Sequence, residues 1–161
     1  MTKRVLTALS VVLAWVALQP GALASGGGDE SFPPAATAAD SDYAAGEKAV
    51  QQKDWKAALA DFDKVAARNP DNASAQNYLG YAYRNLGQFD LAFEHYERAL
   101  RLNPQHRGAH EYLGETYLLV NNLAKAEEQL QALNRLCVFG CEEYDDLKKA
   151  IAEYKTKTAG K

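Results

Sequence analysis

The feature that most constrains how this chain can fold is an internal repeat with a period of 34 residues. A period of this length, with two amphipathic stretches in each unit, is typical of helical arrays in which every unit buries its apolar face against its neighbours. The repeat defines three units, 39–72, 73–106 and 107–140. The recurring residues include Gly46, Gly80 and Gly114; Ala58, Ala92 and Ala126; Leu79 and Leu113; Tyr83 and Tyr117; and Phe62 and Tyr96.

Each unit is predicted to contain two amphipathic helices joined by a short turn. Apolar residues in the middle unit recur at spacings of three and four, which is the pattern of one buried helix face. Gly87 and Asn121 lie between the helices of their units, where a residue in the left-handed conformation is needed. The Asn-Pro pairs at 69–70 and 103–104 are expected to end second helices, because proline disfavours helical geometry in the residue before it. A helical bundle without repeats would share the apolar stripe but not the register of the units.

This pattern resembles that of the tetratricopeptide repeat (TPR) family, closely in the middle unit and partially in the outer two. The resemblance implies an all-α fold: an α-solenoid of three helix-turn-helix units, with a concave groove lined by the first helix of each unit. It also implies which positions of each unit face that groove. The positions expected to contact a partner are Tyr43, Glu47, Asn77, Tyr78, Tyr81, Arg84, Asn85, Glu111, Tyr112 and Glu115. The remaining groove positions are Asp40, Ala44, Val50, Gln51, Ser74, Gly108, Leu118 and Leu119.

The tyrosines of this groove allow two interpretations. Tyrosine offers a large contact area at low entropic cost, so a surface rich in tyrosine and asparagine suits peptide binding. Alternatively, some of these tyrosines pack between helices. Chaperones that present a terminal carboxylate are excluded as partners. TPR domains that bind such chaperones hold the carboxylate with lysine and arginine side chains at set groove positions. The corresponding positions here are Tyr43, Glu47, Tyr78, Gly108 and Tyr112.

Segments outside the repeat are expected to cover or tether it. Residues 141–155 are predicted to form a capping helix, because the last unit of a solenoid needs its open face covered. The acidic residues in the first turn of this helix are attributed to the helix dipole. Residues 25–40, rich in Gly, Ser, Pro and Ala, are predicted to be a flexible linker, and residues 156–161 a disordered tail.

Residues 1–24 have the three-part pattern of a secretory signal peptide. Two basic residues precede an apolar run of 14 residues, Val5–Leu18, and small residues follow, with cleavage expected after Ala24. The run is shorter than the roughly 20 residues that span a bilayer, although a retained N-terminal anchor is the alternative. The protein is therefore expected to be a bacterial periplasmic or secreted one, not inserted in a membrane after cleavage.

The net charge argues against nucleic acid and anionic lipid as partners. Cleavage would remove Lys3 and Arg4, which leaves 16 basic and 21 acidic residues and a net charge of 16 − 21 = −5. A mildly acidic chain without a basic cluster has no electrostatic footprint for a phosphate backbone.

Cys137 and Cys141, the only cysteines of the chain, are expected to form a disulfide. An exported chain lies where disulfides persist, and Gly140 would let the chain reverse between the two residues. The bond would fix the angle of the capping helix. A redox-active pair and a soft-metal site remain alternatives, which would make the protein a thiol-redox or metal-handling accessory protein.

No catalytic signature or cofactor motif is recognised in the sequence, and no enzyme activity, cofactor or metal is expected. His106 and His110 have a spacing that could share a metal if both were helical. His106 falls in the turn between units, however, so surface or packing roles are the better interpretation. The sequence thus predicts a non-enzymatic adapter or assembly factor that binds a peptide or helix of a cell-envelope protein, with self-association possible.

Overall fold

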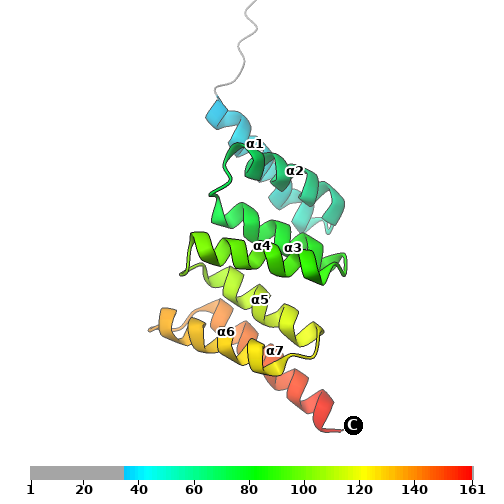
Figure 1. The fold of residues 1–161 in the computed structure, drawn as a ribbon, viewed down its shortest axis with the longest axis vertical. Coiled ribbons are helices and arrows are strands. Elements are labelled where there is room, and N and C mark those ends of the chain that lie inside the picture. The colour runs from blue at the N-terminus through cyan, green and yellow to red at the C-terminus, as the bar shows by residue number, and fades with distance from the viewer. Residues whose placement is uncertain (1–34, 161) are drawn as a thin grey trace, which may run out of the picture. The chain divides into compact units, whose positions relative to one another are not determined.

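The structure, a computed structural model, describes residues 35–160, with side chains from residue 41 onward. The described part consists of seven α-helices arranged as three antiparallel pairs and a final helix (Figure 1). The all-α solenoid of three helix-turn-helix units with a capping helix is therefore confirmed. The helices are α1 (Ala35–Gln51), α2 (Trp55–Arg68), α3 (Ala73–Asn85), α4 (Phe89–Leu102), α5 (Arg107–Leu119), α6 (Leu123–Leu136) and α7 (Glu142–Ala159).

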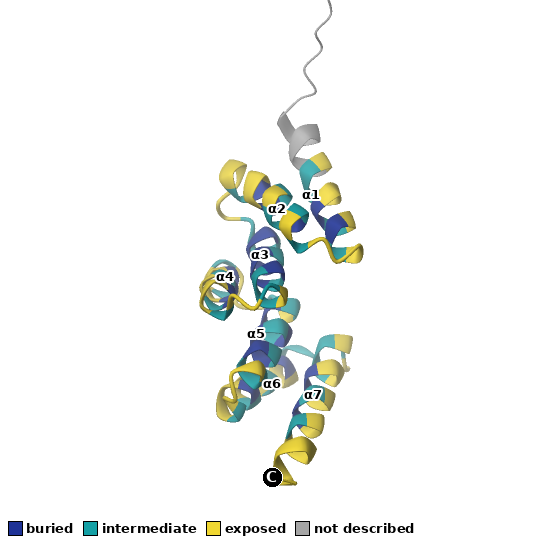
Figure 2. Cartoon of the chain, turned by 90° about the vertical axis from the view of Figure 1, so that its right-hand side faces the viewer, coloured by how far each residue is buried: buried dark blue, intermediate teal, exposed yellow. Residues whose placement is uncertain are grey.

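Among the described helices, the main contacts of each are with its neighbours in the stack. The pairs α1–α2, α3–α4 and α5–α6 pack within units, and α2–α3 and α4–α5 pack between units. The final helix α7 packs against both α5 and α6, which is the place that the first helix of a further unit would take. Figure 2 shows buried residues gathered on the faces that α3, α5 and α7 turn toward their neighbours.

Paired helices approach closely where the first helix of the pair carries a glycine. A Cβ atom at Gly46 would lie 2.8 Å from the ring of Phe62 on α2, and one at Gly80 would lie 2.7 Å from the ring of Tyr96 on α4. Both rings are fully buried. Real Cβ contacts are longer than this, so the absent side chain is what gives each ring its room.

The third glycine, Gly114, has a different neighbour. A Cβ atom there would lie 2.6 Å from Leu147 of α7, and 3.2 Å from Gln129 of α6. Leu147 is fully buried with Ala126, Leu133 and Ile151. The capping helix therefore fills the space beside Gly114 that an aromatic ring fills in the earlier units.

The turn inside each unit uses a left-handed residue at the same place of the 34-residue period. These residues are Lys53 (φ 58°), Gly87 (φ 73°) and Asn121 (φ 60°). The expectation for Gly87 and Asn121 is confirmed. Lys53 was not recognised, because lysine has no special preference for this conformation.

Two segment boundaries differ from those predicted. Helix α1 begins at Ala35, so residues 35–40 of the expected flexible linker are helical. This stretch is rich in alanine, the best helix former. Helix α7 runs to Ala159, so residues 156–159 of the expected disordered tail are helical as well. Its last turns are joined to α6 by the ion pair of Lys155 with Glu127, 2.6 Å between Nζ and Oε1. The expected signal peptide and residues 25–34 of the linker lie outside the described residues.

The crossing at Gly80 can be tested with two alanine substitutions in first helices. Gly80→Ala should lower the free energy of unfolding by about 1–3 kcal/mol, because the new methyl group overpacks the ring of Tyr96. Gly108→Ala is the matched control: its Cβ would lie 3.6 Å from the nearest atom, an ordinary contact, so helix propensity should make it neutral or slightly stabilising. Urea denaturation followed by circular dichroism measures both. Equal midpoints for the two variants would show that the helices do not cross at Gly80.

Candidate functional site

The first helices α1, α3 and α5 and the capping helix α7 line two cavities. We call the first the acidic pocket; its volume is about 390 Å³. It is lined by Tyr43, Ser74, Asn77, Tyr78, His106, Gly108, Glu111, Tyr112, Glu142, Glu143 and Asp146. We call the second the α5–α7 cavity; its volume is about 280 Å³. It is lined by Arg84, Glu115, Leu118, Leu119, Ala150, Glu153, Tyr154 and Lys157.

Most of the groove positions indicated by the sequence lie in one of these cavities. The acidic pocket contains Tyr43, Ser74, Asn77, Tyr78, Gly108, Glu111 and Tyr112, and the α5–α7 cavity contains Arg84, Glu115, Leu118 and Leu119. Glu47, Tyr81 and Asn85 line neither cavity, but Glu47 and Tyr81 contact residues that do. Asn85 is exposed, and its side-chain amide donates to the carbonyl of Tyr81 at 2.8 Å. Ala44 and Gln51 are exposed, Val50 packs on the core, and the side chain of Asp40 is not among those described.

Tyrosine side chains form one wall of the acidic pocket and also belong to the core. Tyr78 stacks on Phe62, with ring centroids 4.5 Å apart and planes 6° apart, and Tyr43 meets both rings edge-on. The hydroxyl of Tyr78 donates to Glu47 at 3.2 Å. Burial, with the nearby Tyr43 and Glu47, raises the pKa of Tyr78 to about 12, so its hydroxyl keeps its proton. Tyr78 therefore packs between helices and also faces the acidic pocket.

The Arg84 side chain is engaged within the chain. Its guanidinium forms an ion pair with Glu115 of α5 and lies 5.1 Å and 5.6 Å from the ring centroids of Tyr81 and Tyr112. Only 15% of the side chain is exposed. An arginine held between two rings and a carboxylate links α3 to α5. Arg84 thus braces the groove in the free protein.

Two polar groups in the acidic pocket lack a partner among the described residues. Asn77 is 5% exposed, and its Oδ1 atom is buried without a hydrogen bond. Glu111 is 8% exposed, and its carboxyl group has no hydrogen bond or ion pair in residues 41–160. Burial, together with the charges of Glu115, Asp146 and Glu143, raises the pKa of Glu111 to about 8. Both groups have hydrogen-bonding capacity left for a ligand.

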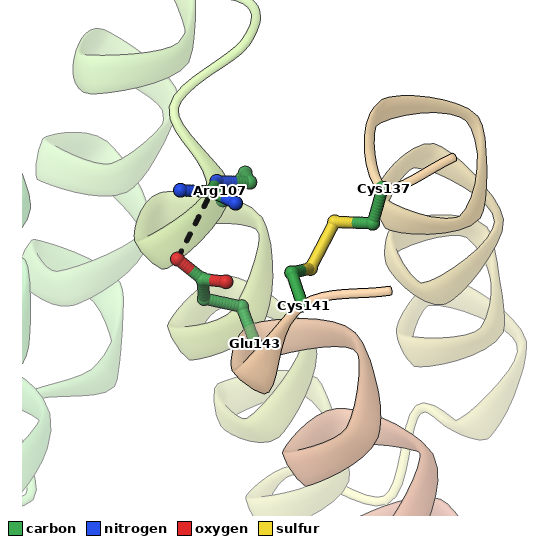
Figure 3. The surroundings of a disulfide bond; sticks show 4 residues. All are labelled: Arg107, Cys137, Cys141 and Glu143. Atoms are coloured by element: carbon green, nitrogen blue, oxygen red, sulfur yellow. Dashed lines mark ion pairs between the residues drawn. A yellow bond between two sulfur atoms is a disulfide. The ribbon is translucent and has the colours of Figure 1, made fainter. Parts of the chain in front are cut away.

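The capping helix contributes three carboxyl groups to the acidic pocket: Glu142, Glu143 and Asp146. Glu143 pairs with Arg107 at the start of α5, 3.5 Å between Oε1 and Nε (Figure 3). The sequence interpretation missed this role, because it assigned the acidic run to the helix dipole alone. One further step of the 34-residue period would have found it, since a unit starting at 141 has Glu142 and Asp146 at groove positions.

His106 and His110, whose spacing could suit a metal site, contact other residues of the helical stack. Nδ1 of His106 accepts from the Ala109 backbone amide and caps α5, and its Nε2 lies 3.3 Å from Ser74 Oγ. Both ring nitrogens of His110 are engaged, with Gln129 Oε1 at 2.8 Å and the Pro104 carbonyl at 3.0 Å. Within the described residues no three His, Cys, Asp or Glu side chains are placed to hold a metal ion. Nor is any helix in this part of the chain long and apolar enough to cross a membrane.

Cys137 and Cys141 are joined by a disulfide that links the end of α6 to the start of α7 (Figure 3). Their α-carbons are 5.6 Å apart, and Gly140 makes the reversal with a φ of 87°. Cys141 is the N-cap residue of α7 but gives no side-chain cap, so acidic residues in the first turn offset the unpaired amides. The loop inside the disulfide exposes Val138 and Phe139, the latter completely.

The sequence matches two models of the family described as tetratricopeptide repeat. One match covers residues 43–106 and the other residues 84–151, so together they span residues 43–151. A comparison with curated proteins found no match.

Solved structures with the same fold come from several sources. The TPR2B domain of yeast Sti1, in its pHsp70 complex, has a TM-score of 0.69 and 18% identity and covers 75% of this chain and 98% of that one. The translocator chaperone SycD of Yersinia enterocolitica type III secretion has a TM-score of 0.67 and 19% identity, covering 74% and 85%. The first TPR domain of Spaghetti (RPAP3), bound to the HSP90 peptide SRMEEVD, has a TM-score of 0.64 and 19% identity, covering 78% and 95%. At these identities the likeness concerns the fold.

Burial of Glu111 makes stability depend on pH. The folded pKa of about 8 lies above the ordinary value of 4.5, so the folded protein binds more protons here than the unfolded chain between these values. This contribution to stability is complete below about pH 4.5 and is lost as the pH rises through about 8. Glu111→Gln should therefore match the parent near pH 4.5 and become increasingly more stable than it toward pH 8. Urea denaturation across this range measures the difference, with the exposed Glu153→Gln as control. A constant difference at all pH values would contradict the prediction.

Replacing both cysteines by serine should lower the free energy of unfolding by about 2 kcal/mol or less, because the closed loop is short. The loss should be local: amide hydrogen exchange should become faster in α7 and stay unchanged in α3, since α7 has no further unit beyond it. Unchanged exchange in α7, together with two free thiols or a bound metal in the parent protein by intact-mass analysis, would favour the thiol-redox or metal-handling alternative.

Proposed function

The chain belongs to the tetratricopeptide repeat family and is a protein–protein interaction module, and we propose that it acts as a non-enzymatic adapter or assembly factor in the bacterial cell envelope. In this proposal residues 1–24 direct export, and the mature protein is periplasmic or secreted. Its groove binds a peptide or a helix of another envelope protein.

The observation that carries the proposal is the row of two cavities along the first helices. The acidic pocket offers polar groups without partners, and the α5–α7 cavity offers apolar surface. Leu119 in the α5–α7 cavity is 56% exposed, although it is a large apolar residue. A binding surface with apolar anchors and a few convergent polar groups is what a peptide or helix needs for affinity and orientation.

The charge of the groove narrows the partner class. The first TPR domain of Spaghetti carries the peptide SRMEEVD, which has three acidic side chains. Four carboxyl groups line the acidic pocket here: Glu111, Glu142, Glu143 and Asp146. Like charges brought together at an interface oppose binding, so an acidic peptide end is not the expected ligand.

Two charge-introducing leucine variants test the proposal in cells that export the protein. Leu119→Glu places a carboxylate in the α5–α7 cavity, whereas Leu91→Glu places one on α4, a second helix. Leu119→Glu should weaken capture of the envelope partner by about tenfold or more, and Leu91→Glu should leave it unchanged. Quantitative co-purification measures capture, and circular dichroism checks that both variants fold. Equal capture by both variants, or a loss confined to Leu91→Glu, would place the interaction outside the groove.

A further inference from the structure

The acidic pocket has walls from four helices and the size of a ligand site. The lining residues are Tyr43 from α1, Ser74, Asn77 and Tyr78 from α3, Gly108, Glu111 and Tyr112 from α5, and Glu142, Glu143 and Asp146 from the N-terminal part of α7. Its volume of about 390 Å³ lies within the range of small-ligand pockets, roughly 300–1,000 Å³. It is therefore large enough for the end of a long side chain.

Asn77 and Glu111, the two buried residues of the pocket that lack a partner among those described, both favour a ligand atom that donates a hydrogen bond. Asn77 Oδ1 is a hydrogen-bond acceptor only, and an ionised Glu111 carboxylate is as well. Each is more than nine-tenths buried and lines the pocket. Asn77 Oδ1 is a buried acceptor without a donor, which costs free energy that a ligand can recover by donating a hydrogen bond. The pocket thus favours a ligand that carries several N–H donors.

The surrounding charges favour a cation over a neutral donor. Of the four carboxyl groups in the pocket, only Glu143 has an ion pair within residues 41–160, with the half-exposed Arg107. His106 adds no competing charge, because burial lowers its pKa and its Nδ1 accepts the Ala109 amide hydrogen. The described residues lack a set of three ligands close enough for a metal ion. A larger organic cation fits instead, and the faces of Tyr43, Tyr78 and Tyr112 can pack against its stem.

We propose that the acidic pocket binds the guanidinium or ammonium group of an arginine or lysine side chain presented by the partner polypeptide. This inference rests on the proposed function, and it assigns the partner a basic residue at the point where its segment crosses α3, α5 and α7. The apolar part of the same segment would then lie toward Leu118 and Leu119 in the α5–α7 cavity.

Proton release is an expected accompaniment of binding. The pKa of Glu111 is raised by burial and by Glu115 on its own helix and Asp146 and Glu143 on α7, and it is lowered by Arg84 on α3. A cation beside Glu111 favours the ionised carboxylate and so drives the proton off. Affinity for the cation should therefore rise between about pH 6 and about pH 8.

The probe is an end-blocked peptide with one arginine between alanines, titrated into the isotope-labelled full protein and followed by NMR. The matched control peptide carries citrulline, which keeps the shape of arginine but is neutral. We expect shifts centred on the side-chain amide of Asn77 and the backbone amide of Gly108, and binding of the citrulline peptide weaker by about tenfold or more. Equal binding of the two peptides, or shifts centred elsewhere, overturns the inference.

Two variants separate charge from shape. Glu111→Gln with Asp146→Asn removes two carboxylates and should weaken binding of the arginine peptide by about tenfold or more, whereas Glu94→Gln, at an exposed position of α4 outside both cavities, should not. Gly108→Leu keeps every charge and places a side chain in the pocket, where a Cβ is tolerated, and should also block binding. Unchanged affinity in either pocket variant, with folding verified by circular dichroism, overturns the inference.

Capture of the partner by the variants distinguishes this inference from the proposed function. If Leu119→Glu abolishes partner capture but Glu111→Gln with Asp146→Asn does not, the basic side chain is wrong and the groove function stands. If the arginine peptide binds in the pocket while the partner is captured independently of the groove, the inference for a polypeptide ligand is overturned. The pocket would then be a site for a free amino acid or polyamine. Loss of partner capture in Leu119→Glu and in Glu111→Gln with Asp146→Asn supports the inference as well as the proposed function.

Discussion

The close approach of helices at Gly46, Gly80 and Gly114 is the constraint on which the stack depends. At each glycine the neighbouring side chain occupies the volume that a Cβ atom would need. The distance between paired helices sets how far apart the first helices of successive units lie. The cavities form along those first helices and α7, the elements that pack closely at these glycines.

Some side chains of the groove already form hydrogen bonds or ion pairs within the chain, and this decides which of its residues are available to a ligand. The Arg84–Glu115 ion pair and the Tyr78–Glu47 hydrogen bond occupy side chains whose residue types suggest binding. The groups left over are Asn77 Oδ1 and the carboxyl groups of Glu111, Glu142 and Asp146. Since paired groups must be separated before they can bind anything else, the unpaired ones govern the choice of ligand. The ligand preference of the groove therefore cannot be read from its residue types alone, because it depends on which of its polar groups are unpaired.

The fold and most groove positions followed from the sequence because both are periodic. The resemblance to the TPR family, carried through the 34-residue period, placed Tyr43, Asn77, Tyr78, Glu111 and Tyr112 on one surface, and in the structure they line one pocket. It could not show that Arg84 is paired across units, because such a pair depends on side-chain conformations on two helices. Glu142 and Asp146 were assigned a local electrostatic role, since the repeat signature had already ended at Gly140. Helix ends were the least predictable, because alanine-rich termini extend a helix without any capping signal.

Contacts restricted to neighbouring helices have a consequence for how the stack comes apart. Among the described helices, α1 packs mainly against α2, and α7 packs against α5 and α6, so the free energy that holds one end is not shared directly with the other. In such arrays folding propagates from unit to unit, and the units need not unfold in a single cooperative step. Trp55, the one tryptophan in residues 35–160, packs against Tyr81 at the boundary between the first and second units. Its fluorescence therefore reports the melting of that boundary, while α7 can separate from the stack without changing it.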